Sequence, residues 1–270
     1  MLLPFTKMNG AGNDFVLIDN RDRGLALTAV QIARLCDRHR GIGADGVLAV
    51  EPARHGADFR FRYYNSDGGE VEMCGNGARC FARFASRLLP DPRTVLTFET
   101  IAGTLSAELR GEQVRIAMSD PTDLVLDSGV TVEGLPAPLH VINTGVPHTV
   151  AFVTDLDHLD VLRLGAALRR HPRFQPAGTN ANFAKVLATG HLAIRTYERG
   201  VENETLACGT GMVAAALVHH LLHHAPSPVR VEVRGGDTLE VGFSKDRKDA
   251  FREVTLTGPA DFVFDGRIEV

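Results

Sequence analysis

Two similar segments, one in each half of the chain, place a cysteine directly before a glycine-containing turn and an apolar helical stretch. Cys74 begins the run Cys-Gly-Asn-Gly-Ala-Arg, and Cys208 begins the run Cys-Gly-Thr-Gly-Met-Val, in a sequence of 270 residues. The patterns before each cysteine also correspond, because strand, helix, strand and strand signals follow one another in the same order in both halves. The repeat predicts a chain that folds as two copies of one half, each with one thiol at the start of a helix.

Corresponding helices and strands support this repeat. Thr28 and Gln31 form a capping-box pattern, which predicts a helix there, and its counterpart in the second half is expected from about residue 157 to 171. Alternating strands are expected at 59–65 and 192–198, each shortly before its cysteine. Each half then ends in further short strands.

Many short alternating strands with few helices predict an α+β fold with largely antiparallel sheets. Turn residues at Asp120 place the domain boundary there, so we expect one domain over 1–120, with 260–270 as a candidate addition, and a second over 121–259. The helix after each cysteine has little polar face, which predicts that its own sheet wraps around it. The two halves would be pseudo-symmetric, with the active site in the cleft between them.

The composition indicates a globular protein with a small partner. Hydrophobic residues make up 44% of the chain, and 29 basic residues are scattered among 33 acidic ones, for a net charge of −4. Neither a nucleic acid nor an anionic membrane surface is therefore indicated as a partner. No apolar run approaches the roughly 18 residues of a membrane span, and the first residues lack the order of a signal peptide, so we expect a cytoplasmic protein.

The remaining cysteines and a group of histidines give no metal site. Four cysteines without a C-x-x-C pair argue against structural zinc and against a thioredoxin-type motif, and Cys36 and Cys80 are expected to be structural. Four histidines near the end of the second cysteine helix have no acidic or cysteine partner nearby in sequence, so we expect an exposed helix end and no bound metal. These histidines are His219, His220, His223 and His224.

Two thiols at helix N-termini suit a particular chemistry. Such a terminus offers unpaired N–H donors and a partial positive charge, which bind anions and lower a thiol pKa. A thiolate and a thiol on opposite faces of one tetrahedral carbon form a base and an acid, and together they invert that centre. The backbone N–H groups of Gly75, Asn76, Gly209 and Thr210 can bind the carboxylate beside it.

Four segments closely resemble the diaminopimelate epimerase family, in collinear order over nearly the whole chain. They are Met8–Phe15, Asn65–Cys80, Gly145–His148 and Glu198–Gly211. The resemblance implies an epimerase that needs neither pyridoxal phosphate nor any other cofactor and that interconverts LL- and meso-2,6-diaminopimelate. This reaction lies on the route to lysine and peptidoglycan. The same resemblance implies a homodimer.

The resemblance also assigns roles to residues of this chain. Cys74 and Cys208 are implied as the acid and base, and His148 and Glu198 as neighbours of the reacting centre that orient the thiols or bind the α-amine. The distal end of the substrate is implied to contact Asn13, Asn65, Asn180 and Arg199, and the α-carboxylate to contact the amides of Gly75, Asn76, Gly209 and Thr210.

Two positions depart from the family pattern. Val146 stands where the family commonly has asparagine, and Gly46 where it often has glutamine. Both would bear on the distal end of the substrate.

Three other functions remain open at this stage. A related cofactor-independent racemase of another amino acid would keep the two thiols but lack the distal contacts. A thiol redox protein would use the cysteines as a switch, although working redox pairs usually have short spacing. A non-catalytic binding protein would hold the ligand without exchanging its α-proton.

Overall fold

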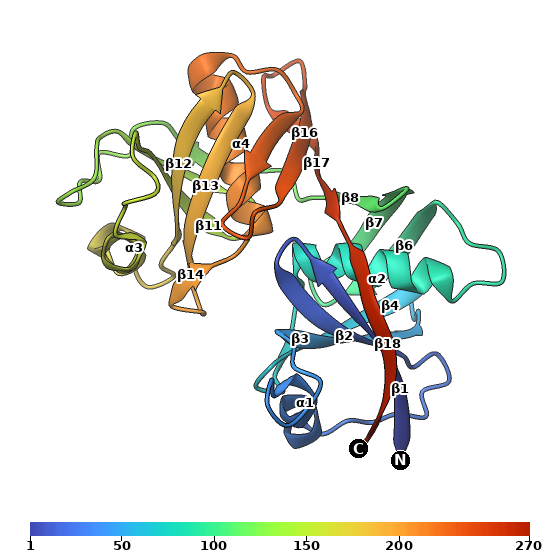
Figure 1. Ribbon diagram of the computed structural model, residues 1–270. Helices are drawn as coiled ribbons and strands as arrows, with labels where there is room; N and C mark the ends of the chain where they lie inside the picture. Colours follow the sequence, from blue (N-terminus) through green and yellow to red (C-terminus); the bar gives the residue numbers. More distant parts are fainter. The chain divides into compact units, whose positions relative to one another are not determined.

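The computed structural model describes residues 1–270 as two compact units. The N-terminal unit comprises Met1–Ala117 together with Gly258–Val270, and the C-terminal unit comprises Met118–Thr257. In Figure 1 the chain runs from the blue N-terminal unit through the green to orange C-terminal unit, and its red end returns to the first. The returning segment begins at Gly258, close to the expected 260, and the change of unit after Ala117 lies close to Asp120.

The N-terminal unit is built mainly from antiparallel strand pairs. Strand β1 lies between β2 and β18, the β2–β3 and β4–β6 pairs are parallel, and the other pairs are antiparallel. Its strands are β1 (Leu2–Gly10), β2 (Asn13–Asp19), β3 (Gly46–Pro52), β4 (Phe59–Asn65), β5 (Glu70–Val71), β6 (Val95–Thr100), β7 (Gly103–Arg110), β8 (Gln113–Ala117) and β18 (Asp261–Glu269).

One helix is buried among these strands. Helix α2 (Gly75–Arg87) contacts β1, β2, β3, β4, β7 and β8. Its Phe81 ring lies 4.9 Å from that of Phe98 and 5.1 Å from that of Phe61, measured between centroids. Aromatic packing of this kind adds to the apolar area that the helix removes from water. The central helix expected after Cys74 is therefore confirmed.

The C-terminal unit repeats this plan. The β11–β12 and β13–β15 pairs are parallel, and the other pairs are antiparallel. Its strands are β9 (Thr122–Val125), β10 (Leu139–Asn143), β11 (Pro147–Phe152), β12 (Asn180–Ala188), β13 (His191–Glu198), β14 (Asn203–Thr205), β15 (Val229–Glu232), β16 (Thr238–Lys245) and β17 (Phe251–Pro259), whose last residues belong to the N-terminal unit.

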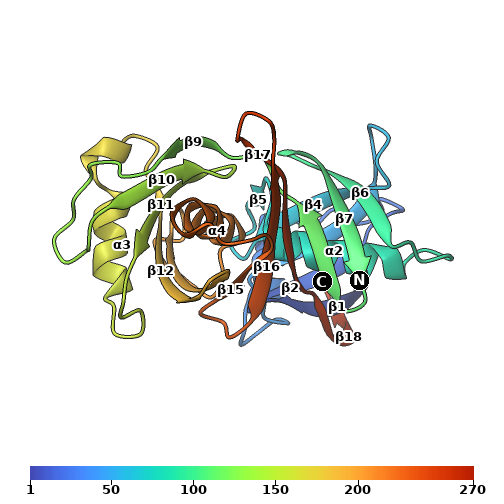
Figure 2. The same cartoon turned by 90° about the horizontal axis from the view of Figure 1, so that it is seen from above.

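Helix α4 (Gly209–His223) is the central helix of this unit. Figure 2 shows it end-on, with β11, β12, β15 and β16 around it. Every residue from Gly211 to His219 is buried, as the absence of a polar face predicts. Helix α4 contacts β10, β11, β12, β13, β15 and β16. The expectation of a sheet wrapped around a central helix is therefore confirmed here too.

The outer helices follow their sequence signals. Helix α1 (Ala29–Cys36) begins with the expected capping box of Thr28 and Gln31. Helix α3 (Val161–Arg169) is shorter than the predicted 157–171, because the Asp160 side chain accepts the Arg163 N–H and caps its start. A 3₁₀ turn follows at Pro172–Phe174. Five strands are not predicted from the sequence: β1, β5, β10, β14 and β18.

The histidine group near the end of α4 corrects one expectation. His219 is fully buried, with its ring centroid 6.3 Å from that of Phe152, so the expected exposed helix end is wrong for this residue. His223 and His224 are exposed. No group of three or more His, Cys, Asp or Glu side chains is arranged to hold a metal ion. None of the helices combines the length and apolar character that crossing a membrane requires.

Candidate functional site

Both predicted thiols stand at the first residue before a buried helix. Cys74 and Cys208 are the N-cap residues of α2 and α4, each with an extended backbone. The Cys74 sulfur accepts the N–H of Gly77 at 3.5 Å, and the Cys208 sulfur lies 3.6 Å from the Thr210 hydroxyl. The first amides of each helix have no intrahelical acceptor and point toward the cysteine end, where the helix dipole favours an anion. Each terminus can therefore bind a carboxylate and stabilise a thiolate.

The other two cysteines have a different environment. Burial raises the pKa of Cys36 to about 11 and the pKa of Cys80 to about 12. Both thiols therefore stay protonated at neutral pH, which fits the structural role expected for them.

A chain of hydrogen bonds joins two predicted site residues in the N-terminal unit. Arg79, fully buried on α2, donates from Nη2 to the Asn76 Oδ1 at 2.9 Å. Asn76 Nδ2 donates to Asn13 Oδ1 at 2.6 Å, and Asn13 Nδ2 donates to Asp45 Oδ2 at 2.9 Å. A guanidinium can only donate and a carboxylate can only accept, so the two ends fix the orientation of both carboxamides.

Further charges hold the Asp45 end of this chain. Arg38 bridges Asp45 and Asp14, with Nη2 to oxygen distances of 2.9 and 2.8 Å, and the nearly buried Lys7 also pairs with Asp14 at 2.8 Å. Burial alone would raise the pKa of Asp14, but hydrogen bonds and charge from Arg38 and Lys7 outweigh it and lower the pKa to about 2. Sequence reasoning missed Asp45 and Arg79 as partners of the site.

Asn65 lies apart from that chain, at the end of β4. It pairs in register with Gly46, the first residue of β3. A Cβ atom at Gly46 would stand 2.4 Å from the Tyr64 carbonyl oxygen and 2.6 Å from the Tyr63 ring. The glutamine common in the family therefore has no room here in this backbone conformation.

In the C-terminal unit, neighbouring strands bring four predicted residues together. His148 on β11 lies opposite Asn180 on β12, and Asn180 Oδ1 accepts the backbone N–H of Arg199 at 2.7 Å. The Arg199 guanidinium donates to the Ala177 carbonyl at 3.0 Å, and Glu198 is the last residue of the adjacent strand β13.

Two side chains of this set, His148 and Glu198, have shifted pKa values. Burial, with a smaller effect of the Arg199 charge, lowers the pKa of His148 to about 3. Burial also raises the pKa of Glu198. Perturbed groups that gather in one place are typical of binding and catalytic sites.

Asn182 is a further member that the sequence analysis does not single out. Its Nδ2 lies 3.0 Å from His148 Nδ1 and 3.0 Å from the Thr149 carbonyl oxygen, and its Oδ1 accepts the Thr196 hydroxyl at 3.0 Å. Asn180 and Asn182 are two positions apart on β12, so their side chains lie on the same face of the strand. This spacing is the sequence signal that could have identified Asn182.

Gly211 brings the start of α4 against this asparagine. A Cβ atom at Gly211 would stand 2.2 Å from Asn182 Oδ1 and 3.4 Å from Cys208 Sγ. The Cys208 thiol and the Asn182 side chain therefore both lie beside the Cβ position of residue 211. This contact joins the cysteine helix to the His148 strand pair within the C-terminal unit.

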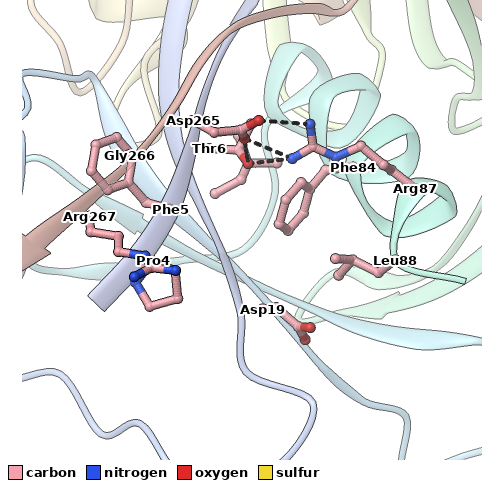
Figure 3. Close-up of a pocket in the computed structure, with 11 residues that line it drawn as sticks. Pro4, Phe5, Thr6, Asp19, Phe84, Arg87, Leu88, Asp265, Gly266 and Arg267 are labelled. Atoms are coloured by element: carbon pink, nitrogen blue, oxygen red, sulfur yellow. Dashed lines mark hydrogen bonds and ion pairs between the residues drawn. The ribbon is translucent and has the colours of Figure 1, made fainter. Parts of the chain in front are cut away.

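A surface pocket of about 440 Å³ in the N-terminal unit contains none of the predicted site residues. Figure 3 shows Arg87 bound to Asp265 and Thr6 above the rings of Phe5 and Phe84. Its walls come from β1, β2, β18 and the end of α2 rather than from the helix start that carries Cys74. Size alone therefore does not select this pocket as the functional site.

Comparison with known sequences identifies the family. The sequence model for diaminopimelate epimerase matches residues 5–124 and 140–263. The chain belongs to the diaminopimelate epimerase family. It is 41% identical to the diaminopimelate epimerase of Aquifex aeolicus over 98% of both chains. It is 45% identical to that of Chlorobaculum tepidum, over 97% of this chain and 99% of that one.

Solved structures show the same fold at lower identity. A phenazine biosynthesis protein of the PhzF family from Bacillus anthracis superposes with a TM-score of 0.73 at 17% identity, over 100% of both chains. A probable proline racemase from Agrobacterium radiobacter superposes with a TM-score of 0.70 at 19% identity, over 99% of this chain and 93% of that one. At such identities the likeness shows the fold alone: the diaminopimelate epimerase family shares its two-domain α+β architecture with these proteins.

Proposed function

We propose that this protein interconverts LL- and meso-2,6-diaminopimelate. It is an isomerase of amino-acid biosynthesis, as its family membership implies. The observation that carries the proposal is a cysteine N-cap on the central helix of each unit, in a chain at least 41% identical to two diaminopimelate epimerases over nearly its full length.

The reaction follows from the two thiols. One thiolate takes the α-proton as its S–H bond forms and the C–H bond breaks, and the electron pair spreads into the α-carboxylate. The other thiol then gives its proton to the opposite face of the carbon, which inverts the centre. The amides of Gly75, Asn76, Gly209 and Thr210 bind the carboxylate most strongly when it carries this extra charge, so they lower the barrier.

The distal end of the substrate is held, in this proposal, by Asn13, Asn65, Asn180 and Arg199. Two observations support it. The Asn13 carboxamide is fixed in orientation by Asp45, and Asn180 fixes the Arg199 backbone. Preorganised groups bind without a further ordering cost, and a guanidinium can hold a carboxylate through two parallel hydrogen bonds.

We further propose that no metal and no pyridoxal phosphate takes part, because the thiols and amides supply base, acid and charge stabilisation. Activity should then survive dialysis against a chelator in the presence of a reductant. A loss that added metal restores would contradict this.

We also propose a cytoplasmic homodimer. Val263 and Phe264 on β18, which pairs with β1, are 56% and 49% exposed. Neighbouring exposed apolar side chains of this kind are a surface for contact with a second copy. Sedimentation of the wild type and of a Phe264→Lys variant tests it, and a monomeric wild type would refute it.

The decisive experiment is incubation with LL-diaminopimelate in deuterated water. We expect loss of the α-proton signal together with appearance of the meso form, and loss of epimerisation in Cys74→Ala and in Cys208→Ala. Racemisation of proline or another amino acid without turnover of diaminopimelate would favour the related-racemase alternative. Ligand binding without deuterium incorporation would favour a binding protein, and activity in a thiol–disulfide exchange assay alone would favour a redox protein.

A further inference from the structure

We infer that Asn182 holds His148 as the tautomer with its proton on Nε2, so that His148 acts as a hydrogen-bond donor to an anionic acceptor. Asn182 is then a positioning residue that acts through His148. The tautomer assignment stands on the structure alone, whereas its consequence for turnover rests on the proposed function.

The Thr149 backbone determines how the Asn182 carboxamide is oriented. A carbonyl oxygen can only accept, so the Asn182 atom 3.0 Å from the Thr149 oxygen must be the amide nitrogen. The Asn182 oxygen then faces the Thr196 hydroxyl, which donates to it at 3.0 Å. The orientation of this carboxamide is therefore determined by its surroundings.

The second proton of the Asn182 amide determines the tautomer of the His148 imidazole. Asn182 Nδ2 lies 3.0 Å from His148 Nδ1. Because Nδ2 donates there, Nδ1 must accept and carries no proton. A neutral imidazole has one N–H, so its proton is on Nε2. Burial and the Arg199 charge keep His148 neutral, since both lower its pKa.

The Nε2 atom is the end of His148 that remains for a ligand. His148 is fully buried, and Nε2 makes no hydrogen bond within the protein. A buried donor without an acceptor is destabilising, and such groups are uncommon unless a bound molecule completes them. An N–H donor suits a carboxylate or a thiolate. It does not suit an ammonium group, so under this assignment the role of binding an α-amine falls to another residue.

Histidine-selective ¹⁵N NMR of the full-length protein at neutral pH tests the assignment directly. The signals of His148 are identified by their loss in His148→Gln. We expect a protonated Nε2 and an unprotonated Nδ1 in the wild type. A proton on Nδ1, or a doubly protonated ring, would overturn the inference whether or not the protein turns over diaminopimelate.

Two variants of the same contact sharpen the test. In Asn182→Asp the new carboxylate can only accept, so the proton of the neutral ring should move to Nδ1 and Nε2 should no longer be a donor. In Thr196→Val the opposite end of Asn182 loses its partner, but the Thr149 carbonyl still orients the amide, so the tautomer should not change. A neutral ring that keeps its proton on Nε2 in Asn182→Asp would overturn the inference, whereas a proton on Nδ1, alone or in a doubly protonated ring, would support it. Should that variant fail to fold, the wild-type spectrum still decides.

Kinetics and ligand titration then address the consequence. We expect kcat/KM to fall about ten- to a hundredfold in Asn182→Asp, as for a lost hydrogen bond to a charged group, and to fall much less in Thr196→Val. If the acceptor is a ligand carboxylate, the Nε2 proton signal shifts when diaminopimelate binds to Cys208→Ala. If the acceptor is the Cys208 thiolate, the signal shifts in the ligand-free protein as the thiol titrates, and this response is absent in Cys208→Ala. A tautomer change with unaltered kinetics would overturn the functional part alone.

Discussion

Replacing Gly211 by alanine should destabilise the C-terminal unit, whereas the equivalent change at Gly77 should not destabilise the N-terminal unit. Both glycines stand three residues after a site cysteine, in the first turn of a central helix. Their surroundings differ. A Cβ atom at Gly211 would stand 2.2 Å from Asn182 Oδ1, but at Gly77 the nearest atoms, from Leu48 and Phe15, would lie at an ordinary 3.5 Å.

The magnitude follows from these distances and from the hydrogen bonds of Asn182. The oxygen would have to retreat by about an ångström to reach ordinary contact near 3.4 Å. Asn182 is held by His148, Thr149 and Thr196, so it cannot swing away freely. Overpacking of this kind costs about 1–3 kcal/mol, against which alanine gains about 0.5–1 kcal/mol over glycine in a helix. We expect a net loss of about 1–2 kcal/mol at position 211, and no loss or a small gain at position 77.

Urea unfolding of the two variants and the wild type measures these free energies, and deuterium incorporation into diaminopimelate measures turnover. Because a displaced Asn182 would also disturb His148, we expect kcat/KM of Gly211→Ala to fall at least about tenfold, well beyond any change in Gly77→Ala. Equal stability and turnover in the two variants would refute the packing argument.

Four further outcomes are expected. Asp45→Ala should lower kcat/KM by about ten- to a hundredfold, because the Asn13 carboxamide loses the carboxylate that orients it. Asp45→Asn should recover part of this loss. Steady-state kinetics measures both variants, and an unchanged KM and kcat in Asp45→Ala would contradict the prediction. Burial, and then the charges of neighbouring histidines, lower the pKa of His219 to about 4, so the unfolded chain binds a proton that the folded one does not, and stability should fall as pH drops from about 6.5 to about 4. Urea titrations at several pH values should show a shallower slope in His219→Gln, and an identical slope would count against this. Val146→Asn should change KM more than kcat, because the family resemblance implies that position 146 bears on the distal end of the substrate, away from the proton transfer; a fall in kcat at unchanged KM would contradict this. Gly46→Gln should lower the free energy of unfolding of the N-terminal unit by more than about 1 kcal/mol, because of the close approach of Tyr63 and Tyr64; wild-type stability in urea unfolding would show that a carboxamide fits at position 46.

The repeat and its local elements could be predicted from the sequence. The glycine turns, the alternation of strands 59–65 and 192–198, and the capping box at Thr28 are local signals, and β4, β13 and α1 follow them closely. The placement of each cysteine at a helix start is also local, because it depends on the few residues that follow. These signals, with the four motif segments, were sufficient for the family and for a correct fold class.

The central position of α4 could also be predicted, because a helix without a polar face must be buried. The burial of His219 could not. Histidines at a helix end usually face solvent. The rings of His219 and His223 lie at similar distances from that of Phe152, 6.3 and 6.2 Å between centroids, yet only His219 is buried in the folded unit.

The contacts between polar groups could not be predicted from the sequence, because they depend on how the chain packs. Asn13, Asp45, Asn76 and Arg79 form one hydrogen-bond chain, although Asn13 and Asn76 lie 63 positions apart in sequence. His148 and Asn182 meet because β11 and β12 pair in parallel, in a register that the sequence does not specify. Local sequence patterns reflect the backbone preference of each segment. The orientation of a carboxamide and the tautomer of a histidine depend on which donors and acceptors surround them, and strand pairing and helix packing bring those partners from distant parts of the chain.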